Sequence, residues 1–135
     1  MAGARWQGSG WVQTDFSDVK AGCPVNKVGW KKGGSALLKD CPALSGVADA
    51  VVRAVAPMPV TAKIRIGWDA TSINAPRVGR ILEDLGIATI AVHGRPRAQA
   101  YSGAPVWHVR REVAAAVTNP LVGTADLQTA SRVCP

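Results

Sequence analysis

The sequence has few of the side chains on which disulfide frameworks and structural zinc sites depend. Its 135 residues include only three cysteines and two histidines. Cys23, Cys41 and Cys134 form neither an even disulfide set nor a CxxC pair, and neither histidine has a cysteine or an aspartate at metal-ligand spacing. We therefore expect no metal site.

Export and membrane-spanning signals are also missing. The N-terminal stretch MAGARWQGSG contains no apolar h-region, and no apolar run approaches the length that crosses a bilayer. We expect no membrane partner, and a reducing cytoplasm is the simplest location for the unpaired cysteines.

Acidic residues are scarce compared with basic ones. There are 9 Asp and Glu against 16 Lys and Arg, which gives a formal net charge of +7. This excess favours a polyanionic partner, above all a nucleic acid. Hydrophobic residues make up 47% of the chain and charged residues 19%, a composition typical of a folded domain rather than of disorder.

Strand-like and helix-like segments alternate along the chain. The Gly-rich residues 1–10 are expected to be disordered, and residues 11–135 to form one domain. Strands are predicted over 11–19, 60–67, 87–94 and 119–123. Helices are predicted from Gly34 with an interruption at Pro42, then over 43–56, 75–85 and 107–117, with a short helical segment closing the chain. Pro76 suits the first turn of its helix, and Gly86 stands where a C-cap glycine belongs.

This β-α-β-α-β-α-β order, at roughly thirty-residue spacing, predicts an α/β fold with a parallel sheet. The strands read as continuous apolar runs, which suits a sheet covered on both faces. Cys23, Lys63, His93 and Asp126 lie at or just beyond the C-terminal ends of the predicted strands. Ligands bind at that edge in both doubly wound sheets and (β/α)8 barrels, so the pattern predicts a site edge without choosing between the two folds.

Three blocks in this order resemble the tRNA-dihydrouridine synthases. They are GCPVNKV with KKGGSALL two residues later, VTAKIRIGWD, and AVHGRPRAQAYSG, and the similarity covers roughly residues 15–130. The resemblance implies an FMN-dependent (β/α)8 barrel that reduces the 5,6 double bond of uridines in tRNA, with NADPH as the reductant. A whole barrel takes about 250 residues. We therefore expect a partial TIM barrel, a central fragment of four βα units resembling the third to sixth strands of the family barrel.

The resemblance also implies the roles of single residues. Cys23 would be the general acid that protonates the uracil ring, and Lys63 and His93 would contact the flavin. The family's Gly-Asn-Gly-Asp stretch, which helps to hold the flavin phosphate, corresponds here to Gly123, Thr124, Ala125 and Asp126. The chain thus departs from the family pattern at Thr124 and Ala125. It departs again before the cysteine, where Lys20 and Ala21 replace the usual Asn and Met.

Basic residues on the loops at the same edge form a candidate tRNA-binding surface. They are Lys27, Lys31, Lys32, Arg95 and Arg97. Each alone is an ordinary solvated loop residue, but around a pocket that receives a flipped uridine they can contact phosphates. Tyr101 can either shape the pocket rim or pack within its loop. Trp68 and Trp107 are assigned to packing.

Two other functions remain open at this point. One is a non-catalytic remnant that binds RNA through its basic loops. The other is a different FMN-dependent barrel oxidoreductase, against which the GCPVNKV and KKGGSALL blocks argue. Four strands in an open sheet would also leave two unpaired edges, so self-association through those edges is expected.

Overall fold

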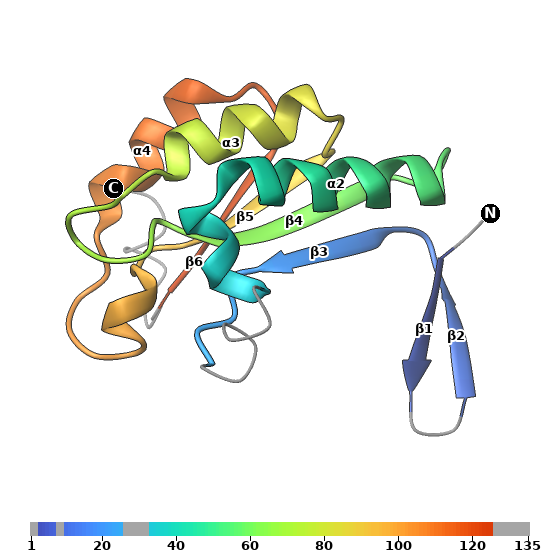
Figure 1. Cartoon of the computed structure of the whole chain (residues 1–135), viewed down its shortest axis with the longest axis horizontal. Helices are drawn as coiled ribbons and strands as arrows, with labels where there is room; N and C mark the ends of the chain where they lie inside the picture. The colour runs from blue at the N-terminus through green and yellow to red at the C-terminus, as the bar shows by residue number, and fades with distance from the viewer. Residues whose placement is uncertain (1–2, 8–9, 26–32, 126–135) are drawn as a thin grey trace.

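The computed structural model describes residues 3–7, 10–25 and 33–125 of the chain. Its strands are β1 (Gly3–Gln7), β2 (Gly10–Thr14), β3 (Ser17–Ala21), β4 (Val60–Arg65), β5 (Thr89–His93) and β6 (Leu121–Thr124). Its α-helices are α2 (Cys41–Val55), α3 (Ala75–Asp84) and α4 (Trp107–Ala116), and the 3-10 helices are η1 (Gly34–Lys39) and η2 (Arg97–Gln99). Figure 1 shows how these elements are arranged.

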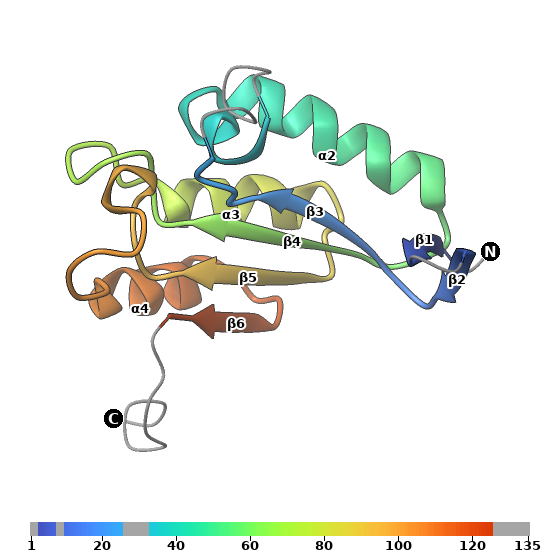
Figure 2. The ribbon, with the colours of Figure 1, turned by 90° about the horizontal axis from the view of Figure 1, so that it is seen from below.

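Strands β3 to β6 form a four-stranded sheet in their sequence order, and all neighbours are parallel. Helices α2, α3 and α4 connect successive strands and lie on one face of this sheet (Figures 1 and 2). In a doubly wound sheet the strand order reverses at a switch point and helices cover both faces. The unbroken order and the single helical layer are therefore those of part of an α/β barrel.

The core lies between the sheet and its helical layer. Alternate residues of the strands point into it, including Val19, Val60, Ile64, Ile90 and Val92. The helices contribute Leu44 and Ala48 from α2, Val78 and Leu82 from α3, and Val109 and Val113 from α4. All of these side chains are at most 7% exposed, so their burial is the main apolar contribution to the stability of the fold.

The opposite face of the sheet is polar, which corrects the expectation of a sheet covered on both faces. In β4 the residues between the core positions are Thr61 and Lys63, and Arg65 ends the strand. Lys20 of β3 is the register partner of Lys63, and His93 of β5 is the partner of Arg65. The helices of the described residues cover only the apolar face, because side chains alternate between the two faces of a strand and only one set is mainly apolar.

The predicted strand over 11–19 is wrong in its extent, because a bend at residues 15–16 divides it. Its first part belongs to β2, which pairs antiparallel with β1, and its second part is β3. The β1–β2 hairpin projects from the N-terminal end of β3, away from the loops that follow the parallel strands (Figure 1). Strand β1 lies within the ten residues for which we expected no order.

Pro42 does not interrupt a helix, in contrast to the prediction. It is near the first turn of α2, where no intrahelical amide bond is lost. Asp40 caps this turn, since its Oδ1 accepts the Ala43 N–H at 3.0 Å.

Helix α3 is confirmed with its first-turn proline, and Gly86 has the positive φ of 87° that its place after a helix requires. None of the helices in the described part of the chain is long and apolar enough to cross a membrane.

Candidate functional site

A cavity of about 480 Å³ lies at the carboxyl ends of the parallel strands. Its walls come from β3, β4, β5 and β6 and from the loops that follow three of them. Six of the predicted site residues line it: Cys23, Lys63, His93, Tyr101, Thr124 and Ala125. The volume lies in the range of small-molecule sites in proteins.

The segment that carries Cys23 is fixed through its backbone. The carbonyl of Cys23 accepts two hydrogen bonds from Ser35, one from the backbone N–H at 3.0 Å and one from the hydroxyl at 2.7 Å. The carbonyl of Gly22 accepts a third, from Nε of Arg65 at 3.1 Å. Cys23 itself is half-buried and not in a disulfide. A half-buried thiol on a fixed backbone can present its proton to a ligand in the cavity.

The cavity is electropositive. Lys20 and Lys63 line it from neighbouring strands at the same register position, and Arg65 lines it two residues further along β4. Among the described lining residues there is no carboxylate. Such a site favours a ligand that is anionic or that gains negative charge during a reaction.

Arg65 was missed by the sequence analysis, although it is the best-buried charged group in the cavity. It is 3% exposed, and Nη1 donates to the carbonyls of Pro96 at 3.2 Å and Ala100 at 2.8 Å. Burial lowers the pKa of its guanidinium because desolvation penalises the charged form, yet an arginine stays protonated near neutral pH. The sequence did contain a signal for Arg65. In an apolar strand, Lys63 and Arg65 at positions i and i+2 must point to the same face, so a role for Lys63 in the cavity also implies one for Arg65.

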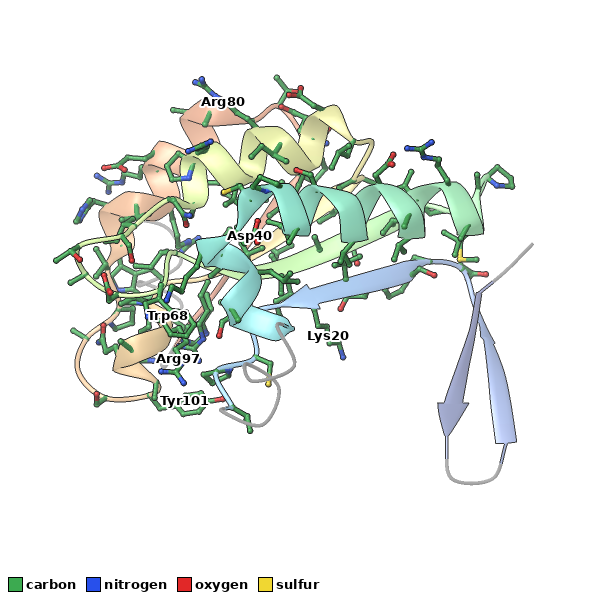
Figure 3. All side chains as sticks on the ribbon, in the orientation of Figure 1. Lys20, Asp40, Trp68, Arg80, Arg97 and Tyr101 are labelled. Carbon is green, nitrogen blue, oxygen red and sulfur yellow. The ribbon has the colours of Figure 1, made fainter. Side chains whose placement is uncertain are left out.

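Tyr101 and His93 meet at the mouth of the cavity. Their rings are in an edge-to-face arrangement, with centroids 6.4 Å apart and planes at 86°. The Arg65 guanidinium lies over the Tyr101 ring, 5.4 Å from its centroid. Tyr101 is nevertheless 72% exposed, so it belongs to the cavity rim rather than to the packing of its loop. In Figure 3 it lies at the same end of the sheet as Arg97 and Trp68.

The chain is similar to known proteins over most of its length. Residues 12–133 match the family described as "Dihydrouridine synthase (Dus)". The chain belongs to the dihydrouridine synthase family. It is 42% identical over 116 residues to a "Probable tRNA-dihydrouridine synthase" of Rhizobium leguminosarum bv. phaseoli, an alignment that covers 86% of this chain and 36% of the relative.

Two relatives named "tRNA-dihydrouridine synthase B" are similarly close. Those of Xanthomonas campestris pv. campestris and Pseudomonas aeruginosa are each 43% identical over 110 residues, which cover 82% of this chain and 33% of each relative. The chain therefore spans about a third of the length of these curated relatives. The family assignment confirms the resemblance drawn from the three sequence blocks.

The predicted phosphate-binding stretch of this family member is only partly described. Thr124 and Ala125 line the cavity, and the Thr124 hydroxyl is buried with no hydrogen-bond partner among the described residues. Gly123 faces the helical layer instead. A Cβ at Gly123 would overlap the guanidinium of Arg110, which packs over the Trp107 ring at 5.0 Å from the ring centroid. Asp126 lies outside the described residues.

The predicted RNA contacts are distributed differently from the expectation. Arg97 is half-buried, whereas Arg95 is only 2% exposed and its Nε and Nη2 donate to the Gly103 carbonyl at 3.1 and 2.8 Å. Arg95 is therefore not the solvated loop residue that was expected: it braces the loop that carries Tyr101, and its contact with RNA stays a prediction. Lys27, Lys31 and Lys32 lie outside the described residues, as do Cys134 and the predicted C-terminal helical segment.

Proposed function

We propose that this chain forms part of a flavin-dependent tRNA-dihydrouridine synthase that reduces uridine to 5,6-dihydrouridine in tRNA. The carrying observation is that one cavity joins Cys23, Lys63 and His93 at the strand ends, in a member of the dihydrouridine synthase family. We also infer that β3 to β6 correspond to the third to sixth strands of the family barrel. Cys23 and Cys41 are free thiols, and no helix of the described residues is long and apolar enough to cross a membrane. We infer a cytoplasmic location, with which both observations agree.

Reduction of the C5–C6 double bond adds a hydride to one carbon and a proton to the other. FMN, when bound, would supply the hydride, and NADPH would restore it. In this proposal the Cys23 thiol supplies the proton, and its thiolate is reprotonated from solvent after product release. The bonds from Ser35 and Arg65 to the flanking carbonyls limit the positions that the thiol can take.

The described residues fit a flavin. The Thr124 hydroxyl offers a buried polar group without a partner among the described residues, and Lys63 offers a cation in the cavity. Lys63 and His93 would hold the ring system, and the Lys63 cation would balance negative charge on it. Gly123, Thr124, Ala125 and Asp126 would hold the phosphate end, although Thr124 and Ala125 depart from the family pattern.

RNA would approach from the rim of the cavity. We infer that Arg97 and Tyr101 contact it there, together with Lys27, Lys31 and Lys32 from outside the described residues. In the sheet of the described residues β3 and β6 are the edge strands, and we infer that copies of the chain associate through these two edges.

A non-catalytic RNA-binding role is the second candidate. Two observations favour it: Lys20 replaces the amide that the family pattern has before the cysteine, and Arg110 occupies the helical side of Gly123. Both affect positions at which the family pattern places cofactor or substrate contacts.

Two measurements on the 135-residue chain separate these candidates. Titration with FMN, followed by flavin absorbance and fluorescence, should show one bound flavin per chain. With NADPH and an unmodified tRNA transcript, dihydrouridine should then appear by mass spectrometry of the digested RNA. Cys23→Ala should bind FMN normally and form at least about a hundredfold less dihydrouridine. Cys41→Ala, which changes a thiol outside the cavity, is the matched control and should remain active.

Unchanged uridine reduction in Cys23→Ala would remove the cysteine from the mechanism. A chain that binds no FMN and still binds tRNA would contradict the enzyme proposal and favour the RNA-binding role.

A further inference from the structure

Two cationic side chains from other segments of the chain lie over the ring of Trp68. It lies in the loop between β4 and α3 and is half-buried. The Nζ of Lys39, at the end of η1, is 4.7 Å from its ring centroid, and the Cζ of Arg97, at the start of η2, is 4.6 Å away. Both distances are within the range of cation–π contacts. This Lys39–Trp68–Arg97 cluster corrects the assignment of Trp68 to simple packing.

Backbone hydrogen bonds hold the three segments of the cluster together. The Arg97 N–H donates to the carbonyl of Gly67 at 2.9 Å, and the Ala98 N–H donates to that of Trp68 at 2.8 Å. On the other side, Nδ2 of Asn74 donates to the carbonyl of Leu38 at 2.7 Å, next to Lys39. The positions of both cations relative to the indole are therefore set by the fold and not only by their flexible side chains.

The cluster lies at the cavity end of the sheet. Figure 3 shows Trp68 and Arg97 at the same end of the sheet as Tyr101, which lines the cavity, whereas Arg80 lies on the helical layer away from them. Lys39 is exposed, so its charge is accessible from outside.

The neighbouring carboxylates are engaged in local hydrogen bonds. Asp40 caps α2, and Oδ1 of Asp69 accepts bonds from Thr71 and Ser72. These bonds lower the pKa of Asp69 and keep its carboxylate turned into its own loop. Neither acid is in ion-pair contact with Lys39, within the part of the chain that the structure describes.

We propose that the Lys39–Trp68–Arg97 cluster is a docking site for the phosphodiester backbone of the substrate RNA, next to the cavity that receives the base. The proposal rests on tRNA being the substrate. Phosphates are recognised by Lys and Arg, and holding these long side chains before binding reduces the conformational entropy lost on association. The indole thus acts as a positioning group, and the ammonium and guanidinium make the contacts.

The test measures the binding of the 135-residue chain to an unmodified tRNA transcript by fluorescence anisotropy, over a series of NaCl concentrations. Lys39→Gln should weaken binding and make the slope of log K against log[NaCl] shallower by about 0.7–0.9, the value for one lost phosphate contact. Trp68→Leu removes no charge, so it should weaken binding about three- to tenfold while leaving the slope nearly unchanged. Trp68→Phe keeps an aromatic ring and should bind close to the wild type.

Arg80→Gln is the matched control, because it also removes one exposed cation but from the helical layer, and its slope should stay that of the wild type. Urea unfolding of each variant checks that it is folded. A Lys39→Gln slope equal to that of Arg80→Gln, or wild-type binding by Trp68→Leu, would overturn the docking site alone. A wild-type chain that binds no tRNA at any salt concentration would overturn both the docking site and the proposed substrate.

Discussion

Ser35 donates both its backbone N–H and its hydroxyl to the backbone carbonyl of Cys23, which lies twelve residues earlier in the chain. Both lone pairs of that carbonyl are thereby used, and Ser35 is only 2% exposed. The main chain at the thiol is therefore fixed, and Cys23 can move its sulfur only by rotating its own side chain. Ser35 belongs to the KKGGSALL block, so one structural role of that block is to hold the backbone at Cys23.

Replacing Ser35 tests how much this bond contributes. Ser35→Ala removes the hydroxyl donor and keeps the N–H, so the free energy of unfolding should fall by about 1 kcal/mol. Cys23 should also react faster with a disulfide reagent, measured in a Cys41→Ala, Cys134→Ala background. Ser102→Ala is the control, since its exposed hydroxyl donates a similar bond to the Gln99 carbonyl at 2.8 Å. Equal stability and equal thiol reactivity in Ser35→Ala and its parent would contradict the role of Ser35.

Removing the Arg65 guanidinium should be among the more destabilising changes at the cavity. Arg65→Met leaves the carbonyls of Gly22, Pro96 and Ala100 without their donor, and a loss of at least about 2 kcal/mol in the free energy of unfolding is expected. Arg65→Lys retains the charge but not the fork of donors, and it should be intermediate. Urea denaturation measures both. Arg77→Met, on the exposed side of α3, should be nearly neutral, and a similar loss there would mean that the effect is not specific to Arg65.

Glu83 should make stability depend on pH. Its Oε1 accepts bonds from the N–H and hydroxyl of Thr118, both at 2.7 Å, and from the N–H of Asn119 at 3.0 Å. These bonds, that from the Thr118 hydroxyl first, lower the pKa of Glu83 below its ordinary 4.5. A lowered folded pKa gives stability above pH 4.5 that is lost as the pH falls through the folded pKa.

Glu83→Gln should therefore be less stable than the wild type at pH 7, and the difference should shrink as the pH falls from 5 to 3. Thermal unfolding across that range measures it, with the exposed Glu112→Gln as the control. A difference between Glu83→Gln and the wild type that is constant with pH would show that the charge of Glu83 is not involved.

Two glycine-to-alanine changes should have opposite effects. A Cβ on Gly67 would overlap the carbonyl oxygen of Ser72 and lie 2.7 Å from Cα of Ile73, so Gly67→Ala should lower the free energy of unfolding by about 1–3 kcal/mol. A Cβ on Gly46, within α2, would meet nothing within 4 Å. Gly46→Ala should raise the free energy of unfolding by about 0.5–1 kcal/mol, because alanine is the better helix residue. Urea denaturation compares the two, and a stabilising Gly67→Ala would contradict the close approach at that loop.

The repeating βα units were predictable because their signals are local. The first-turn proline and terminal glycine of α3, and the branched residues of β4, each depend on a short window of sequence. The bend that separates β2 from β3 carries Asp15 and Phe16, with no glycine or proline, so its local signal was weak: the turn-favouring side chains of Thr14, Asp15 and Ser17. The burial of Arg95 also depends on a loop eight residues away, and such contacts are not visible in the sequence pattern.

The candidate site was likewise predictable only where its residues depend on the fold class or on a motif. Cys23, Lys63 and His93 could be grouped because strand ends converge on one edge, a consequence of the fold class, whereas the roles expected of them came from the resemblance to the family. The Lys39–Trp68–Arg97 cluster joins residues up to 58 positions apart through loop conformation alone, and no periodicity or motif marks it.

Arg65 bonds to the loop after β3 through Gly22 and to the loop after β5 through Pro96 and Ala100. Neither loop can separate from β4 without breaking a bond of the same guanidinium, so the two should open as one cooperative unit. In native-state hydrogen exchange, the amides of both loops should then share a single opening free energy. A ligand that enters the cavity would therefore require both loops to open together. A substitution in one loop should then also change the opening rate of the other.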